Sequence, residues 1–159
     1  MSYGDVRFIG LNTNLDCTPG SPQYEWLSAE MRSSDFMQAY WRIILCHQPP
    51  YTCANVHPED PAVQAYLVPL FEQYGVHMVF SGHNHVYELY SQNGITYIVT
   101  GGGGSSFYEL LEDTVPPIRE FGASFLYHYC IVDVDVPNHC LRMKAVDVDG
   151  QVFDSFEVR

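Results

Sequence analysis

Three short apolar runs limit the folds open to this chain more than any other feature of the sequence. They span residues 41–46, 76–80 and 95–100, and a fourth run covers residues 6–11. Continuous apolar runs of this length are typical of strands covered on both faces, as in a parallel sheet. Because the carboxyl ends of parallel strands gather at one edge of a sheet, the residues that follow these runs are expected to meet in space.

Two helical segments accompany these runs. Ser21, followed by a proline, suits an N-cap with proline in the first helical position, and we expect this helix to reach about Ser33. A second helix is expected to begin at Asp60, because the apolar residues after it recur with helical spacing. We expect Pro69 to kink or split this helix and Gly75 to end it.

The last third of the chain alternates apolar and polar residues. This alternation predicts strands near residues 127–136, 141–148 and 151–158, and Asp149-Gly150 predicts a type I′ hairpin between the last two. The sequence therefore predicts an α/β (α+β) fold with a mixed sheet that ends in an antiparallel meander. With no internal repeat and no linker, residues 1–159 are expected to form a single domain.

The charge of the chain excludes several classes of partner. Seven Lys and Arg residues stand against nineteen Asp and Glu, which gives a net charge of −12. Such an acidic chain is not expected to bind a nucleic acid or a membrane surface. Phosphate chemistry here would need a metal or a group of histidines.

The number and spacing of the cysteines bear on two kinds of small-protein structure, the zinc ribbon and the disulfide framework. There are five, widely spaced and without a Cys-x-x-Cys pair, so a zinc ribbon is excluded and a disulfide framework is not expected. The sequence does not decide whether two of the cysteines form a single disulfide bond.

Histidines and glycines follow the apolar runs. His47 directly follows the first run, the second leads into Gly-His83-Asn-His85, and the third leads into glycines 101–104. Neutral imidazole is a common ligand for Zn, Fe and Mn-type metals. Two histidines two residues apart diverge in an extended segment, so they suit two metals about 3.5–4 Å apart better than one. The other histidines outside the loop after His47 are expected to be structural; these are His77, His128 and His139.

Residues 43–51 and 76–88 resemble the second half of calcineurin-like metallophosphoesterases, most closely the purple acid phosphatase branch. Residues 3–9, 20–27 and 147–156 extend the resemblance over nearly the whole chain. The resemblance implies the second half of a four-layer αββα sandwich. It also implies a metal-dependent phosphoric ester hydrolase of binuclear type, similar to acid phosphatases that act on phosphomonoesters.

The resemblance also implies roles for the histidines. His47 and His83 would bind one metal and His85 the other. The complete enzyme would hold two divalent or trivalent ions of Fe, Zn or Mn, whereas this chain alone is expected to bind at most one, weakly.

Substrate-facing residues follow from the same resemblance. His57 lies where purple acid phosphatases often place a histidine that binds the phosphate or protonates the leaving group, although a simple loop histidine is an equal alternative. Asn84 and Tyr51 would line the site, each with a structural role as the alternative, and Glu88 is expected to be a supporting acid. The substrate would be a small phosphate ester or a phosphoprotein.

The chain departs from the family in one respect. An Asp motif, a Gly-Asp motif with the metal-bridging Asp, and a Gly-Asn-His motif do not occur before the shared segments. We therefore expect a fragment that is inactive alone, whose partner is a second copy or the N-terminal half. The alternatives are a non-catalytic interaction or oligomerisation module and a phosphodiesterase of the same superfamily. Members of this branch are often exported from the cytoplasm.

Overall fold

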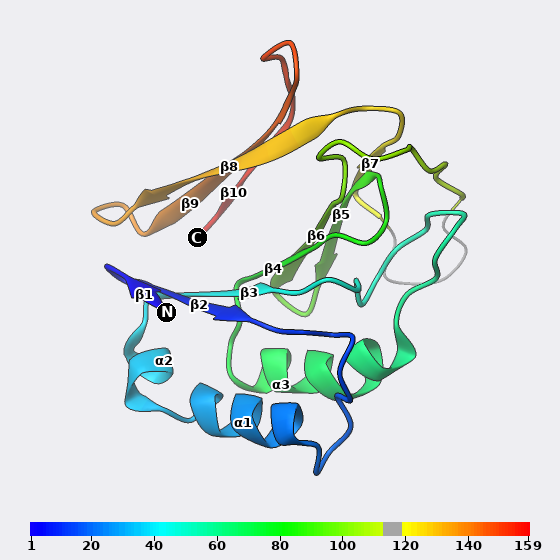
Figure 1. Ribbon diagram of the computed structural model, residues 1–159. Helices are drawn as coiled ribbons and strands as arrows, with labels where there is room; N and C mark the ends of the chain where they lie inside the picture. The colour runs from blue at the N-terminus through cyan, green and yellow to red at the C-terminus, as the bar shows by residue number, and fades with distance from the viewer. Residues whose placement is uncertain (113–118) are drawn as a thin grey trace.

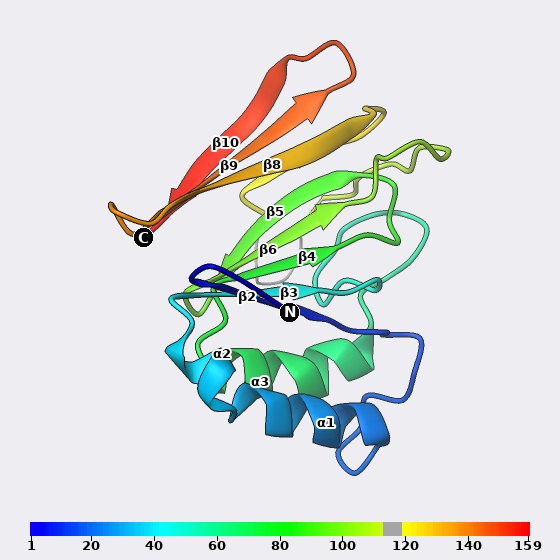
Figure 2. The ribbon, with the colours of Figure 1, turned by 60° about the vertical axis from the view of Figure 1, so that its left-hand side comes forward.

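A computed structural model describes residues 1–112 and 119–159. Helices lie on one face of a seven-stranded mixed sheet, and a separate three-stranded sheet lies over its other face (Figures 1 and 2). The arrangement is the predicted α/β fold, with one helical layer and two sheets. In the described part of the chain no helix covers the outer face of the smaller sheet.

The larger sheet has the order β1-β2-β3-β4-β6-β5-β7. Strands β2, β3, β4 and β6 run parallel to one another, and β1, β5 and β7 are antiparallel to their neighbours. The four parallel strands correspond to the four predicted runs. The strands span β1 Ser2–Tyr3, β2 Val6–Gly10, β3 Trp41–Leu45, β4 Met78–Ser81, β5 Tyr87–Gln92, β6 Ile95–Thr100 and β7 Phe121–Ala123.

Helix α1 (Pro22–Met31) confirms the first predicted helix, and the Ser21 side chain accepts a hydrogen bond from the Tyr24 backbone N–H. A short helix α2 (Ser34–Gln38), capped by Ser33, follows it and was not predicted. Ser33 therefore marks a break between two helices, because its side chain accepts from the Phe36 backbone N–H in the same way.

The second predicted helix is split, as expected. The Asp60 carboxylate caps its start, and a π-helical segment, Val63–Leu67, runs directly into α3 (Val68–Gln73). Pro69 has no N–H to donate and its ring would clash with the carbonyl four residues earlier, so the widened turn before it accommodates the proline. Gly75, in the left-handed region with φ 64°, follows the helix.

The smaller sheet is the predicted meander, with order β10-β9-β8. The predicted type I′ turn at Asp149-Gly150 is wrong, because only Gly150 has a positive φ. The Asp147 carboxylate instead accepts hydrogen bonds from the Asp149 and Gln151 backbone N–H groups, and these hold a wider turn. The strands span β8 His128–Asp135, β9 Cys140–Asp147 and β10 Val152–Val158.

Strand β5 was not predicted, although its turn carried a signal. Asn93 and Gly94 join β5 to β6 and both have positive φ, 50° and 79°, as a type I′ hairpin requires. The hairpin places β5 next to β6, on the side away from β4. An antiparallel strand therefore extends the sheet beyond its parallel strands.

The larger sheet is covered on both faces, as its continuous apolar runs predict. Ile44 packs with the helices, together with Leu27 and Phe71, whereas Ile43 packs with Leu141 and its neighbours of the smaller sheet. Within the described residues, no helix is long and apolar enough to cross a membrane. All five cysteines are free thiols.

Candidate metal centre

The histidines meet at the carboxyl edge of the parallel strands. His47 follows β3 and His83 follows β4, and the Gly82 backbone N–H donates to the His47 carbonyl across 3.1 Å. The Thr13 hydroxyl, from the loop after β2, accepts hydrogen bonds from the His47 and Gln48 backbone N–H groups at 3.2 and 2.9 Å. Backbone hydrogen bonds therefore position this edge of the site.

His47 and His83 face each other. His47 Nε2 lies 3.1 Å from His83 Nδ1, and the ring centroids are 4.9 Å apart. Two nitrogens that are each about 2.0–2.1 Å from a shared ion lie about 2.9–3.4 Å apart, according to the coordination angle. The pair therefore has a spacing that fits two ligand positions on a single ion, and the shared ion that the family resemblance implies stays a prediction.

His85 contacts the loop that follows β6. Its Nδ1 lies 2.6 Å from the Ser106 carbonyl oxygen, and its ring stacks on Tyr108 at 4.3 Å. A carbonyl on one nitrogen holds a proton there and leaves the other nitrogen free to bind a metal. His83 has a positive φ of 64°, which is uncommon for a residue with a side chain. The two histidines therefore lie in a bend of the backbone and not in the extended segment on which the spacing argument rests.

His57 joins the group from the long loop after β3. Its ring lies 4.2 Å from the His83 ring, centroid to centroid, and 5.7 Å from the Tyr108 ring. The structure thus brings together His47, His57 and His83, and the Tyr108 ring contacts both His57 and His85.

Asn84 and Tyr51 are placed differently from the histidines. Asn84 is 0% exposed, and its side-chain amide donates to the Thr52 hydroxyl and the His57 carbonyl, both at 2.9 Å. Tyr51 packs edge-on against Tyr97 at 4.9 Å beside the helical core. Both have the packing contacts of a structural role, and a role in lining the site stays a prediction.

The glycine run after β6 packs closely against the loop that carries Asn84 and against His128. A Cβ on Gly101 would lie 1.9 Å from the Asn84 carbonyl oxygen, and one on Gly102 would lie 2.2 Å from His128 Nδ1. Only glycine lets the two loops approach this closely. Nothing lies within 4 Å of a Cβ built on Gly103.

Electrostatics favour neutral imidazole at the centre of the group. Burial, and then the neighbouring histidines His57, His47 and His85, lower the pKa of His83, while Asp60 opposes this shift. A neutral imidazole is the form that binds a metal.

The histidines supply only part of a metal-ligand set. Among the described residues, no group of three or more His, Cys, Asp or Glu side chains is arranged to hold a metal. The pair His47 and His83 supplies two nitrogens, and His85, whose Nδ1 contacts the Ser106 carbonyl, supplies a third. These residues fit part of a binuclear ligand set and lack a bridging carboxylate.

Four contact residues of the site were not predicted from the sequence. Thr13, Thr52, Ser106 and Tyr108 come from loops that are distant in sequence, and none stands in a recognisable motif. Their roles follow only from the fold that brings these loops to one edge.

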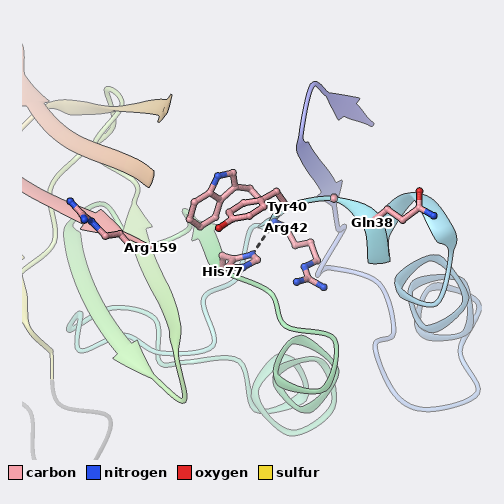
Figure 3. A pocket seen from close by; sticks show the side chains of 7 residues that line it. Gln38, Tyr40, Arg42, His77 and Arg159 are labelled. Carbon is pink, nitrogen blue, oxygen red and sulfur yellow. Dashed lines mark hydrogen bonds between the residues drawn. The ribbon is translucent and has the colours of Figure 1, made fainter. Parts of the chain in front are cut away.

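A separate cavity of about 380 Å³ lies at the opposite, amino ends of β3 and β4 (Figure 3). Arg42, His77 and Arg159 are among the residues that line it. His77 Nδ1 accepts a hydrogen bond from the Arg42 backbone N–H at 3.1 Å. His77 therefore holds strands together away from the metal centre, in the structural role expected for it.

Comparison with known proteins identifies the family. Residues 2–87, more than half of the chain, match the family model for calcineurin-like phosphoesterases. The chain belongs to the calcineurin-like phosphoesterase family.

Within this family, the chain is similar to purple acid phosphatases. It is 41% identical over 69 residues to purple acid phosphatase 1 of Ipomoea batatas, and this matched segment covers 43% of this chain and 15% of that protein. It is 28% identical to probable inactive purple acid phosphatase 1 of Arabidopsis thaliana, over 98% of this chain and 29% of that protein. The structure of a purple acid phosphatase from yellow lupin (Lupinus luteus) seeds matches with a TM-score of 0.82 and 27% identity, over 99% of this chain and 31% of that one. The chain thus spans less than a third of the length of these relatives.

Proposed function

We propose that this chain is a histidine-bearing part of the catalytic domain of a binuclear phosphoric ester hydrolase of the acid phosphatase type. The observation that carries the proposal is the approach of His47 Nε2 to His83 Nδ1, at 3.1 Å, on the carboxyl edge of a metallophosphoesterase fold. The chain would act as a single domain, residues 1–159.

Each histidine has a role in this proposal. His47 and His83 hold one ion of Fe, Zn or Mn, and His85 contributes to a second. Such ions, when bound, lower the pKa of a water and polarise the phosphoryl oxygens. His57, whose ring lies 4.2 Å from the His83 ring, binds the phosphate of a small ester or a phosphoprotein, or protonates the leaving alcohol. Asn84 and Tyr51 support the rim of the site.

The chain alone is proposed to be inactive. Two divalent ions about 4 Å apart repel each other by about 17 kcal/mol at an effective dielectric constant of 20. Three neutral imidazoles do not offset that repulsion, whereas a carboxylate shared by both ions does. At most one ion is therefore expected to bind here, weakly.

Metal analysis and a phosphatase assay on the same sample test the proposal. We expect Zn²⁺ or Co²⁺ to bind with no more than one ion per chain, and His83→Ala to abolish binding. His139→Asn is the matched control, because His139 lies outside the site and asparagine tolerates its φ of 50°. Metal binding that survives His83→Ala, or turnover of an aryl phosphate by the pure chain, contradicts the proposal.

A second candidate is a non-catalytic interaction module, and the space between the two sheets favours it. A cavity of about 540 Å³ there is lined by Phe8, Leu45, Phe80 and residues of β8. Leu45 is 43% exposed, although it lies in the middle of a sheet. Exposed apolar sheet surface of this kind attracts another polypeptide.

For this second candidate the proposed occupant is a second copy of the chain. Sedimentation equilibrium distinguishes a monomer from a dimer. A dimer that Leu45→Asp dissociates supports this candidate, and a monomer at every concentration rejects it.

A further inference from the structure

We propose that Glu88 is a positioning residue for the candidate site, whose buried carboxylate fixes the loop carrying His57 against the turn that carries His83 and His85. The inference rests on the proposed function only for the role given to His57.

Glu88 lies in β5 and is 0% exposed. One carboxylate oxygen accepts a hydrogen bond from the Thr52 hydroxyl at 2.6 Å, and the other accepts from the Cys53 backbone N–H at 2.7 Å. Hydrogen bonds to a carboxylate are shorter and about twice as strong as those between neutral groups. The loop is therefore tied to the sheet five residues before His57.

Thr52 links Glu88 to the segments that carry the histidines. Its hydroxyl donates to Glu88 and also accepts from the Asn84 side-chain amide at 2.9 Å. The same amide donates to the His57 carbonyl at 2.9 Å. Asn84 stands between His83 and His85 in sequence, so one side chain links their turn to the His57 backbone.

A ring of hydrogen bonds surrounds the carboxylate. The Cys53 carbonyl accepts from the Leu111 backbone N–H at 2.8 Å, and Arg119 donates to the Leu111 carbonyl at 3.1 Å. Arg119 also lies 3.5 Å from Glu88, and the Tyr90 hydroxyl donates to Glu88 at 2.8 Å. Burial, and then the Glu88 charge, raise the pKa of Tyr90, so its hydroxyl stays a donor.

This arrangement is more than a stabilising ion pair. A buried charged pair is often no better for stability than apolar residues of similar volume. Two of the carboxylate's contacts are made to Thr52 and Cys53, on the His57 loop. The geometry thus points to a role in placing that loop.

NMR on the metal-free chain tests this role. The His57 and His83 rings, 4.2 Å apart, should give cross-peaks in a nuclear Overhauser spectrum. Thr52→Val keeps the shape of the side chain but removes the hydroxyl, and we expect these cross-peaks to disappear. Thr52→Ser keeps the hydroxyl and should restore them. In Glu88→Leu, the Cys53 amide should exchange with solvent about 10- to 100-fold faster.

Tyr90→Phe is the matched control, because it removes a donor to Glu88 from the strand side and leaves both loop contacts in place. It should keep the His57–His83 cross-peaks. Cross-peaks that persist in Thr52→Val, or that vanish equally in Tyr90→Phe and Thr52→Ser, overturn the proposal. If Glu88→Leu does not fold, the two Thr52 variants still decide the question.

A zinc titration of the same variants separates this inference from the proposed function. If the wild-type chain binds no zinc but its ring cross-peaks depend on the Thr52 hydroxyl, the proposed metal centre fails and the role of Glu88 stands. If zinc binds at His47 and His83 but the cross-peaks do not depend on the Thr52 hydroxyl, the proposed metal centre stands and the role of Glu88 fails.

Discussion

Protonation of His77 should weaken this fold at mildly acidic pH. His77 Nδ1 accepts a hydrogen bond from the Arg42 backbone N–H at 3.1 Å, so this nitrogen carries no proton in the folded chain. The ring packs edge-on against Trp41 at 4.9 Å. Burial, and then the Arg42 charge, lower the pKa of His77 to about 4 from an ordinary value of 6.5.

The sign and size of the effect follow from proton linkage. Between pH 6.5 and pH 4 the unfolded chain binds a proton at His77 that the folded chain does not, so the free energy of unfolding falls as the pH falls. A pKa difference of about 2.5 corresponds to about 3.4 kcal/mol in full, of which about 2 kcal/mol is lost by pH 5. Solvent reaches part of this ring, so the expected loss at pH 5 is about 1–2 kcal/mol.

Urea unfolding at pH 7.5 and pH 5.0 measures this loss. His77→Gln keeps an acceptor for the Arg42 N–H but does not titrate, so its stability should fall by about 1–2 kcal/mol less than that of the wild type. Other acid-sensitive groups, including His128, whose pKa burial also lowers, act equally in both proteins. Equal losses in the wild type and His77→Gln would refute the reasoning.

Three destabilising substitutions, two of them paired with a control variant, test the packing of the fold. Gly101→Ala should destabilise the chain by about 1–3 kcal/mol in urea unfolding, because its Cβ would meet the Asn84 carbonyl at 1.9 Å, whereas Gly103→Ala should change stability by less than about 0.5 kcal/mol. Ser21→Ala removes the cap of α1 and should cost about 1 kcal/mol in thermal unfolding, while Ser21→Asp should keep most of that stability. Phe71→Ala, in the helical core at 0% exposure, should cost about 3–5 kcal/mol, and a loss below 1 kcal/mol would contradict the packing described.

The parallel strands and their histidines were predictable because the information is local. The apolar composition of a run such as residues 41–46 directly predicts that the run is buried, and His47 is the next residue in the sequence. The first cap at Ser21 and the split at Pro69 were predictable for the same reason, since each depends on a few neighbouring residues. Strand β5 also has a local signal, the hairpin turn at Asn93-Gly94.

The rest of the site depends on contacts between distant segments. Strands β1 and β7 contain two and three residues and exist only through their pairing, so no pattern within them predicts a strand. The orientation of Asn84 depends on the positive φ of the preceding His83, which sequence does not reveal. Glu88 is fully buried, which is rare for an acid, and its partners Thr52 and Arg119 lie 36 and 31 residues away.

The two halves of the candidate metal centre differ in how completely this chain builds them. His47 and His83 are held at a mutual distance that suits one ion by contacts that need no metal, namely the Gly82 hydrogen bond and the Thr13 hydroxyl. His85 is also fixed, by the Ser106 carbonyl, but it belongs to no group of three or more His, Cys, Asp or Glu side chains that could hold a metal among the described residues. A preformed pair loses less conformational entropy on binding than a single ligand with no partner. The first position should therefore retain measurable metal affinity in this chain, and the second should gain it only when another polypeptide supplies carboxylates beside His85.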